Sequence, residues 1–149
     1  MAEGALAGQQ KRTRRRLIQK VNMAALPALT VLPGEYAVCR LDPRASVPAE
    51  AAAGPFWAAV RTAEELSLVV PQAAAPAQGR CETGWRIIKV TGPLDFGLTG
   101  VLAGIARPLA EAGISIFAIS TFDTDYVLVK AEKLEAACTA LCAAGYPLV

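Results

Sequence analysis

The fold is decided between Gly84 and Lys130, which read GWRIIKVTGPLDFGLTGVLAGIARPLAEAGISIFAISTFDTDYVLVK. The apolar run Trp85–Val90 predicts a strand, and the Gly/Pro loop after it leads into apolar residues at helical spacing. Two further apolar runs, residues 114–120 and 126–130, are joined by a short acidic turn and predict a hairpin. The stretch is therefore typical of the first part of a βαββαβ unit.

The remaining elements of such a unit follow directly. Ala131–Ala144 is a second helical pattern, and Tyr146–Val149 is a short apolar piece that we expect to form the last strand. The first helix is expected to begin near Asp95–Gly97 and to run to Ala112. Its buried face is predicted to consist of Leu98, Val101, Leu102, Ile105, Leu109 and Ala112. Residues 114–120 are apolar on both faces, which indicates a central strand covered on each side.

The chain before this unit favours short strands with little helix. We expect strands at Leu29–Leu32, Tyr36–Leu41, Phe56–Arg61 and Leu66–Val70, each bounded by turn signals. The segment after them is rich in Ala, Pro and Gly, and it indicates a linker. The predicted organisation is a basic extension, a first half, a linker and a second half, at residues 1–25, 26–71, 72–83 and 84–149.

Composition and charge exclude several classes of function. No apolar run reaches the roughly 18–20 residues that a spanning helix needs, and no apolar signal core follows the basic start. We therefore expect a soluble, cytoplasmic protein with no membrane contact. Residues 1–22 carry a net charge of +5, which leaves −3 for the rest of the chain and argues against a nucleic-acid surface. The basic start is expected to be disordered, and we prefer a dispensable extension to a tail that binds nucleic acid.

The chemistry-bearing residues indicate no catalytic or metal centre. The four cysteines, Cys39, Cys81, Cys138 and Cys142, are expected to be small buried hydrophobic residues and not a disulfide framework. Cys138 and Cys142 would share a helix face, but the chain has no histidine to complete a metal site. The lack of histidine also excludes Cys-His and Ser-His pairs, and no phosphate loop occurs. We expect no enzyme, no metal and no cofactor.

Several strings of the sequence resemble a known family. The strings WRIIKVTGPLDFGLTGVLA, PLAEAGISIFAISTFDTDYVLV and LEAACTAL are similar to the ACT domain, in particular to small bacterial ACT proteins related to the cytosolic arginine sensors of the CASTOR type. The segments LPGEYAVCRL and FWAAVRTAEELSLVVP resemble the N-terminal half of the same proteins. The resemblance, which covers Leu29–Val149, implies an α+β, ferredoxin-like βαββαβ ACT domain preceded by an abbreviated ACT-like half.

The resemblance also implies where a ligand would bind. In ACT domains the ligand lies between the loop after the first strand and a neighbouring domain or subunit. The matching positions here are the loop Gly92–Thr99 and the hairpin Ser120–Asp125. The candidate ligand-binding residues are Asp95, Phe96, Gly97, Leu98, Thr99, Ser120, Thr121, Asp123 and Asp125.

A free amino acid is a zwitterion, so its site needs partners for both charges. Backbone N–H groups at the start of the first helix are suited to hold the α-carboxylate. Asp123 or Asp125 is suited to accept hydrogen bonds from the α-ammonium group. Structural roles are open alternatives: both aspartates are at home in a turn, Asp95 is a candidate N-cap, and Phe96 belongs either to the core or to the pocket.

The sequence therefore predicts an amino-acid-binding regulatory or sensory protein without catalytic activity. Its partners are expected to be a free amino acid and either further copies of the chain or a separate regulatory protein. The alternative is an interaction module that forms dimers and keeps only a vestigial pocket. The identity of the amino acid is left open by the sequence.

Overall fold

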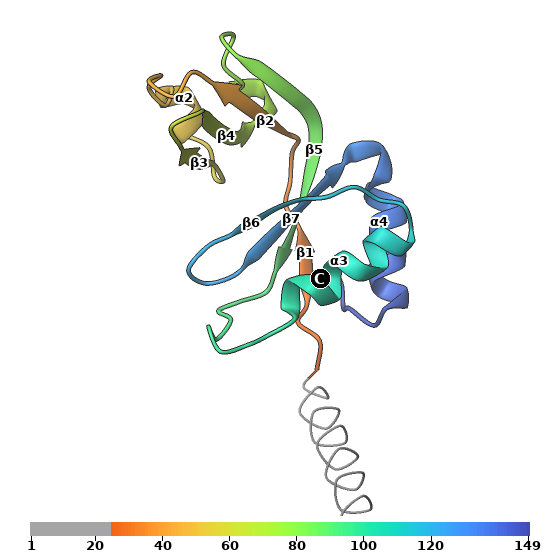
Figure 1. Cartoon of the computed structure of the whole chain (residues 1–149). Helices are drawn as coiled ribbons and strands as arrows, with labels where there is room; N and C mark the ends of the chain where they lie inside the picture. The colour runs from red at the N-terminus through yellow and green to blue at the C-terminus, as the bar shows by residue number, and fades with distance from the viewer. Residues whose placement is uncertain (1–24) are drawn as a thin grey trace, which may run out of the picture.

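The computed structural model describes residues 25–149, which form a single seven-stranded sheet in the order β3-β4-β2-β5-β7-β6, with β1 paired to β5 (Figure 1). The strands are β1 Leu29–Val31, β2 Tyr36–Leu41, β3 Ala58–Arg61, β4 Leu66–Pro71, β5 Arg80–Val90, β6 Phe117–Ser120 and β7 Asp125–Lys130. The α-helices are α2 Ala49–Ala52, α3 Val101–Glu111 and α4 Leu134–Ala143, with short 3-10 helices at Gln72–Ala74 and Ala131–Lys133. The predicted basic extension lies outside the described residues, apart from Ala25.

Strand β5 is the longest element of the sheet and belongs to both halves of the chain. Its first residues pair with β2, in a register that places Arg40 opposite Arg80 and Tyr36 opposite Trp85. Its last residues pair with β7 on one edge and with β1 on the other. Figure 1 shows β5 running from the N-terminal half at the top into the C-terminal half. The two halves therefore share one hydrogen-bonded strand.

Each half has the same strand order around β5. In the first half β3, β4, β2 and β5 lie side by side, with the short helix α2 between β2 and β3 in the sequence. In the second half the matching order is β6, β7, β5 and β1. The first half thus has an ACT-like order with its second helix reduced to Gln72–Ala74. In the second half a strand from the N-terminal part of the chain takes the place of the fourth strand.

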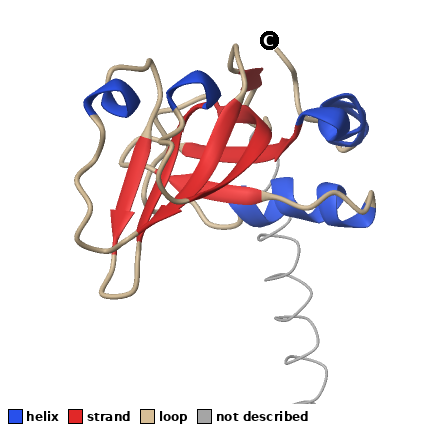
Figure 2. Ribbon diagram, turned by 90° about the horizontal axis from the view of Figure 1, so that it is seen from above, coloured by secondary structure: helices blue, strands red, loops and turns tan. Residues whose placement is uncertain are grey.

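Helices α3 and α4 cover one face of the second half, and Figure 2 shows both on the same side of the strands. The core beneath them is apolar because each contributing strand turns alternate residues toward it. Its fully buried members include Leu29, Ile88, Ile105, Leu109, Val127 and Leu141. The spacing of Ile105 and Leu109 confirms the predicted inward face of the first helix in its central part.

The opposite face of the sheet carries a core that both halves build together. Tyr36 and Val69 from the first half pack with Ile87 and Leu128, and partly buried aromatic side chains surround them. Phe56 contacts Tyr126 with ring centroids 4.7 Å apart, which joins a residue before β3 to one on β7. On β6 one face is half-buried through Phe117 and Ile119, whereas Ala118 and Ser120 on the other face are exposed.

Four sequence-based expectations are corrected by the structure. The segment predicted as a central strand covered on each side contains β6, which is an edge strand because it pairs only with β7 among the described strands, and one of its faces is exposed. The predicted last strand makes only an isolated bridge, Leu29 to Leu148, because β1 already occupies the adjacent edge of β5. Residues 80–83 of the predicted linker belong to strand β5. Helix α3 begins at Val101, after the Gly-rich loop has ended.

The cysteines also differ from expectation. Cys39 and Cys81 lie opposite each other on β2 and β5 and form a disulfide. Sequence spacing gave no sign of this pair, because the register that brings the two residues together depends on a bulge between Tyr36 and Val38. Cys138 and Cys142 are free thiols on α4. None of the helices between residues 25 and 149 is long and apolar enough to cross a bilayer.

The helix face of the second half provides a stability test. Ile105 is fully buried, whereas Leu102, which was expected to be buried, is only partly covered. Ile105→Ala should lower the free energy of unfolding by about 2–5 kcal/mol, because it leaves a cavity in a closed core. Leu102→Ala should cost clearly less, about 1–2 kcal/mol, since its site is open to water. Denaturant unfolding of both variants measures this, and an equal loss would contradict the placement of α3.

Candidate ligand-binding pocket

The loop after β5 is fastened to the β6–β7 turn by hydrogen bonds. Leu94 N–H donates to the carbonyl oxygen of Asp123 at 2.7 Å. Thr124 Oγ1 donates to the carbonyl oxygen of Val90 at 2.6 Å, and Thr124 is 5% exposed. Gly92 also lies against this turn, where an added Cβ would come within 2.9 Å of the Asp123 carbonyl oxygen. Loop and turn therefore hold a fixed spacing at the end of β5.

Asp95 organises the loop and does not cap the helix. Its Oδ1 accepts a hydrogen bond of 2.6 Å from Gly97 N–H, and its carbonyl oxygen accepts one of 3.0 Å from Leu98 N–H. This is the local bonding expected of an aspartate in a turn. The N-cap of α3 is Gly100, with φ at 82° and no side chain to accept a hydrogen bond. The alternative of Asp95 as the N-cap is therefore wrong.

The N-terminus of α3 faces the space between the loop and the hairpin. Gly104 N–H bonds to the Gly100 carbonyl oxygen as the first helical hydrogen bond. The N–H groups of Val101, Leu102 and Ala103 come before this bond and have no acceptor within the helix. These groups carry the positive end of the helix dipole, which favours an anion beside Val101 and Leu102.

Loop, helix start and hairpin enclose an open pocket of about 310 Å³. This volume lies at the lower end of the range, roughly 300–1,000 Å³, for small-molecule sites. The pocket is lined by Leu94, Asp95, Phe96, Leu98, Gly100, Val101, Leu102, Ser120, Thr121, Phe122, Asp123, Thr124 and Asp125.

The charged groups of this lining are all carboxylates. Asp95, Asp123 and Asp125 line the pocket, and no lysine or arginine is among the lining residues. The three differ in their bonding. Asp95 accepts from the loop, and Asp125 Oδ1 accepts from Ser120 Oγ at 2.5 Å. The Asp123 carboxylate receives no hydrogen bond from any residue between 25 and 149, so it is the one best able to take an external cation.

Two exposed aromatic rings link the loop to the hairpin. Phe96 and Phe122 meet edge to face, with ring centroids 4.9 Å apart and planes at 77°. They remain 75% and 80% exposed, although both line the pocket. Together with Leu98, which is 55% exposed, they make an apolar rim beside the carboxylates, of which Asp95 and Asp123 are exposed and Asp125 is half-buried. Such rings can contact a cationic group through their faces.

Seven of the nine predicted residues lie in this lining, and two do not. Gly97 closes the turn of Asp95 and Thr99 lies exposed before the helix, because α3 starts later than predicted. The six lining residues that the sequence did not single out are Leu94, Gly100, Val101, Leu102, Phe122 and Thr124. A glycine at position 100, directly before the helical run, was the available sign that the helix begins there.

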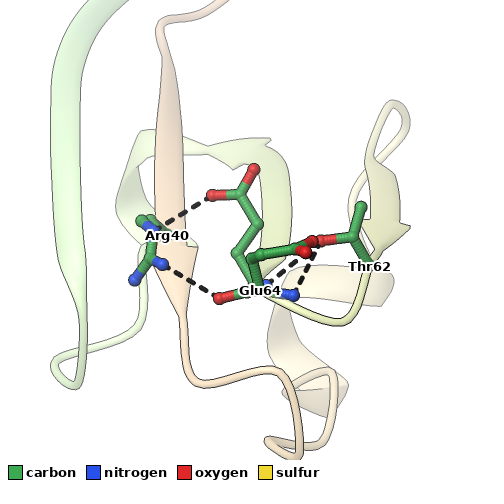
Figure 3. Close-up of polar contacts among 4 residues, drawn as sticks. Arg40, Thr62 and Glu64 are labelled. Atoms are coloured by element: carbon green, nitrogen blue, oxygen red, sulfur yellow. Dashed lines mark hydrogen bonds and ion pairs between the residues drawn. The ribbon is translucent and has the colours of Figure 1, made fainter.

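In the first half, two arginines join the strands to the loop after β2 and to the β3–β4 turn. Arg61 donates to the carbonyl oxygens of Pro43 and Ala45, which joins the end of β3 to the loop after β2. Arg40 donates to the Glu64 carbonyl oxygen at 2.9 Å and pairs with Glu65 at 3.2 Å (Figure 3). Guanidinium groups thus connect loop and turn here, where the second half keeps a pocket.

Thr62 stabilises this same turn. Thr62 Oγ1 accepts hydrogen bonds from the N–H groups of Glu64 and Glu65 (Figure 3). These bonds close the tight β3–β4 turn.

As for metals, no cluster of three ligating side chains that could hold an ion occurs in the part of the chain that is described.

Thr124 allows the fixed spacing of the pocket to be tested. Thr124→Val removes the hydroxyl that serves the Val90 carbonyl and leaves that buried acceptor unpaired, so stability should fall by about 1–3 kcal/mol. Thr124→Ser keeps the hydroxyl and should lose less. Urea unfolding midpoints of the two variants give the comparison. A valine variant as stable as the serine variant would show that this hydrogen bond does not hold the turn.

Comparison with known proteins gives the same organisation. The sequence profile described as ACT domain matches residues 80–143, and a profile described as an N-terminal domain matches residues 34–78. The cytosolic arginine sensor for mTORC1 subunit 1 of Mus musculus is 35% identical over 104 residues, which are 60% of this chain and 31% of that protein. The chain therefore spans less than a third of the length of the curated relatives that it matches.

Solved structures cover the chain more fully. Protein Atu0741 from Agobacterium tumefaciens is 37% identical with a TM-score of 0.78, and the match covers 85% of this chain and 94% of that one. The regulatory subunit of aspartate kinase from Thermus flavus shares the fold, with a TM-score of 0.57, 18% identity and coverage of 80% and 98%. The strand order, the βαββα second half completed by β1 and these similarities show that the chain belongs to the family of ACT-domain proteins.

Proposed function

We propose that the chain binds a free amino acid in the pocket between the Gly92–Gly100 loop and the Ser120–Asp125 hairpin. The observation that carries this proposal is the pairing of opposite electrostatic features in one small space. The uncapped start of α3 offers N–H groups for an α-carboxylate, and Asp123 offers a free carboxylate for the α-ammonium group. A zwitterion is the ligand that uses both.

The acidic lining selects among amino acids. Asp95 and Asp125 add negative charge beyond what one ammonium group needs, and the rim is aromatic. A side chain with a delocalised positive charge suits both features, because guanidinium groups bond to carboxylates and stack against rings. The mouse relative is by name an arginine sensor. Arginine is therefore the ligand of choice, and the role is regulatory, without catalysis.

The regulatory output passes through another protein or through further copies of the chain, in the cytoplasm. Phe96, Leu98 and Phe122 support this part of the proposal, since they present an exposed apolar rim beside the pocket. An interaction module whose pocket is vestigial is the second candidate, and it rests on the same rim. The two differ in whether a ligand binds at all.

A thermal-shift panel tests the proposal. It contains the twenty amino acids and, as a further compound, citrulline. Arginine at 100 times its dissociation constant should add about 2.7 kcal/mol of stability, which is a rise of several degrees in Tm. Citrulline has nearly the shape of arginine but no side-chain charge, so it should give a much smaller shift. A shift with another amino acid alone would replace arginine as the ligand. No shift with any compound would leave the interaction module as the function.

Paired variants locate the binding in this pocket. Asp123→Asn should weaken binding by about 1.5–3 kcal/mol, the scale of a hydrogen bond to a charged group. Asp125→Asn is the matched control on the same turn, because the Asp125 carboxylate already accepts a hydrogen bond from the Ser120 hydroxyl. This variant should lose less binding free energy than Asp123→Asn. Both should leave the fold intact, because asparagine is also favoured in turns. Calorimetric titration of the two variants measures the difference, and equal losses would contradict the role assigned to Asp123.

A further inference from the structure

The disulfide between Cys39 and Cys81 lies in the part of β5 that pairs only with a strand of the first half. Residues 80–84 of β5 have β2 as their only paired strand, since pairing with β7 begins at Trp85. The disulfide joins the two strands at directly opposed positions in this stretch. It therefore fastens the first half to the strand that both halves share.

The disulfide also encloses most of the first half. The two cysteines are 42 residues apart in sequence, and α2, β3, β4 and the Gln72–Ala74 turn lie between them. A link of this kind restricts the unfolded chain and so stabilises what it encloses. The second half, including α3, α4 and the pocket, lies outside the loop. Opening the disulfide should therefore weaken the first half selectively.

The two sulfur atoms differ in how easily they can be reached. Cys39 is 1% exposed within the core under α2, whereas Cys81 is only partly buried. A thiolate can attack only an accessible sulfur, so Cys81 is the entry point for exchange. In a reducing compartment such as the cytoplasm proposed above, protein thiols are kept reduced, and the disulfides that do form there are usually transient or redox-sensing.

We propose that Cys39 and Cys81 form a reversible redox switch that locks or loosens the first half. One thiolate of a dithiol reductant attacks Cys81 Sγ, forms a mixed disulfide and releases Cys39 as a thiolate that takes up a proton. The second thiol of the reductant then attacks the mixed disulfide and releases Cys81. Two electrons pass to the protein, and the reductant leaves as a disulfide. A binding partner would therefore meet a closed first half in the oxidised chain and a loosened first half in the reduced chain.

The test uses the full chain with Cys138→Ser and Cys142→Ser, so that only this pair titrates. The protein is equilibrated in mixtures of reduced and oxidised dithiothreitol and then treated with iodoacetamide. The number of labels on each molecule is measured by intact-mass spectrometry. Oxidised protein should carry no label and reduced protein two. Amide exchange in β2 and β4 should accelerate by roughly several hundredfold on reduction, the scale implied by opening a loop of this size. Exchange in α3 and α4 should stay unchanged, and reoxidation should reverse the effect.

Three outcomes would overturn the proposal. Two labelled thiols under fully oxidising conditions would show that the pair does not form a disulfide. Unchanged exchange in β2 and β4 on reduction would show that the disulfide locks nothing, and equal acceleration in both halves would show that its effect is not selective. The variant Cys39→Ala/Cys81→Ala should behave as the reduced chain does in either buffer. None of these readouts involves an amino-acid ligand, so they are independent of the function proposed above.

Discussion

The hydrogen bonding of β5 on both of its edges is the constraint on which the rest of the structure depends. Its first residues complete the sheet of the first half, and its last residues carry β7 and β1 in the second half. One strand therefore serves as the fourth strand of one ACT-like unit and the first strand of the next. The shared core on the sheet face opposite α3 and α4 follows from this arrangement, because β5 brings residues of both halves together around Ile87 and Leu128.

The pocket is positioned by the end of the same strand. Val90, the last residue of β5, accepts the hydrogen bond from Thr124 that brings the hairpin against the loop. The loop then reaches Gly100, where the absence of a capping side chain leaves the N–H groups of α3 available. The charge distribution of the pocket thus comes from local chain geometry and three carboxylates. In the first half, Arg61 fastens the loop after β2 to the end of β3, and Arg40 on β2 bonds to the β3–β4 turn.

Local patterns were sufficient to predict most strands and both long helices, because each carries its own period and its own turn residues. The family was indicated by the resemblance of several strings to the ACT domain. They were insufficient wherever a partner distant in sequence decides the outcome. The edge position of β6, the place of β1 beside β5 and the Cys39–Cys81 pair all depend on sheet register. The loop and the hairpin of the candidate pocket were predicted. Val101 and Leu102 were missed because the helix start was placed too early, and Thr124 lies within the predicted hairpin but was not singled out.

The most direct measurement of the central claim, that a zwitterion binds between the end of β5 and the hairpin, is amide NMR during titration with the amino acid that stabilises the chain most. The account predicts that the largest shift changes occur at Val101 and Leu102 and along Ser120–Asp125. Amides of β2 to β4 should barely move. Shift changes concentrated in the first half would contradict the account.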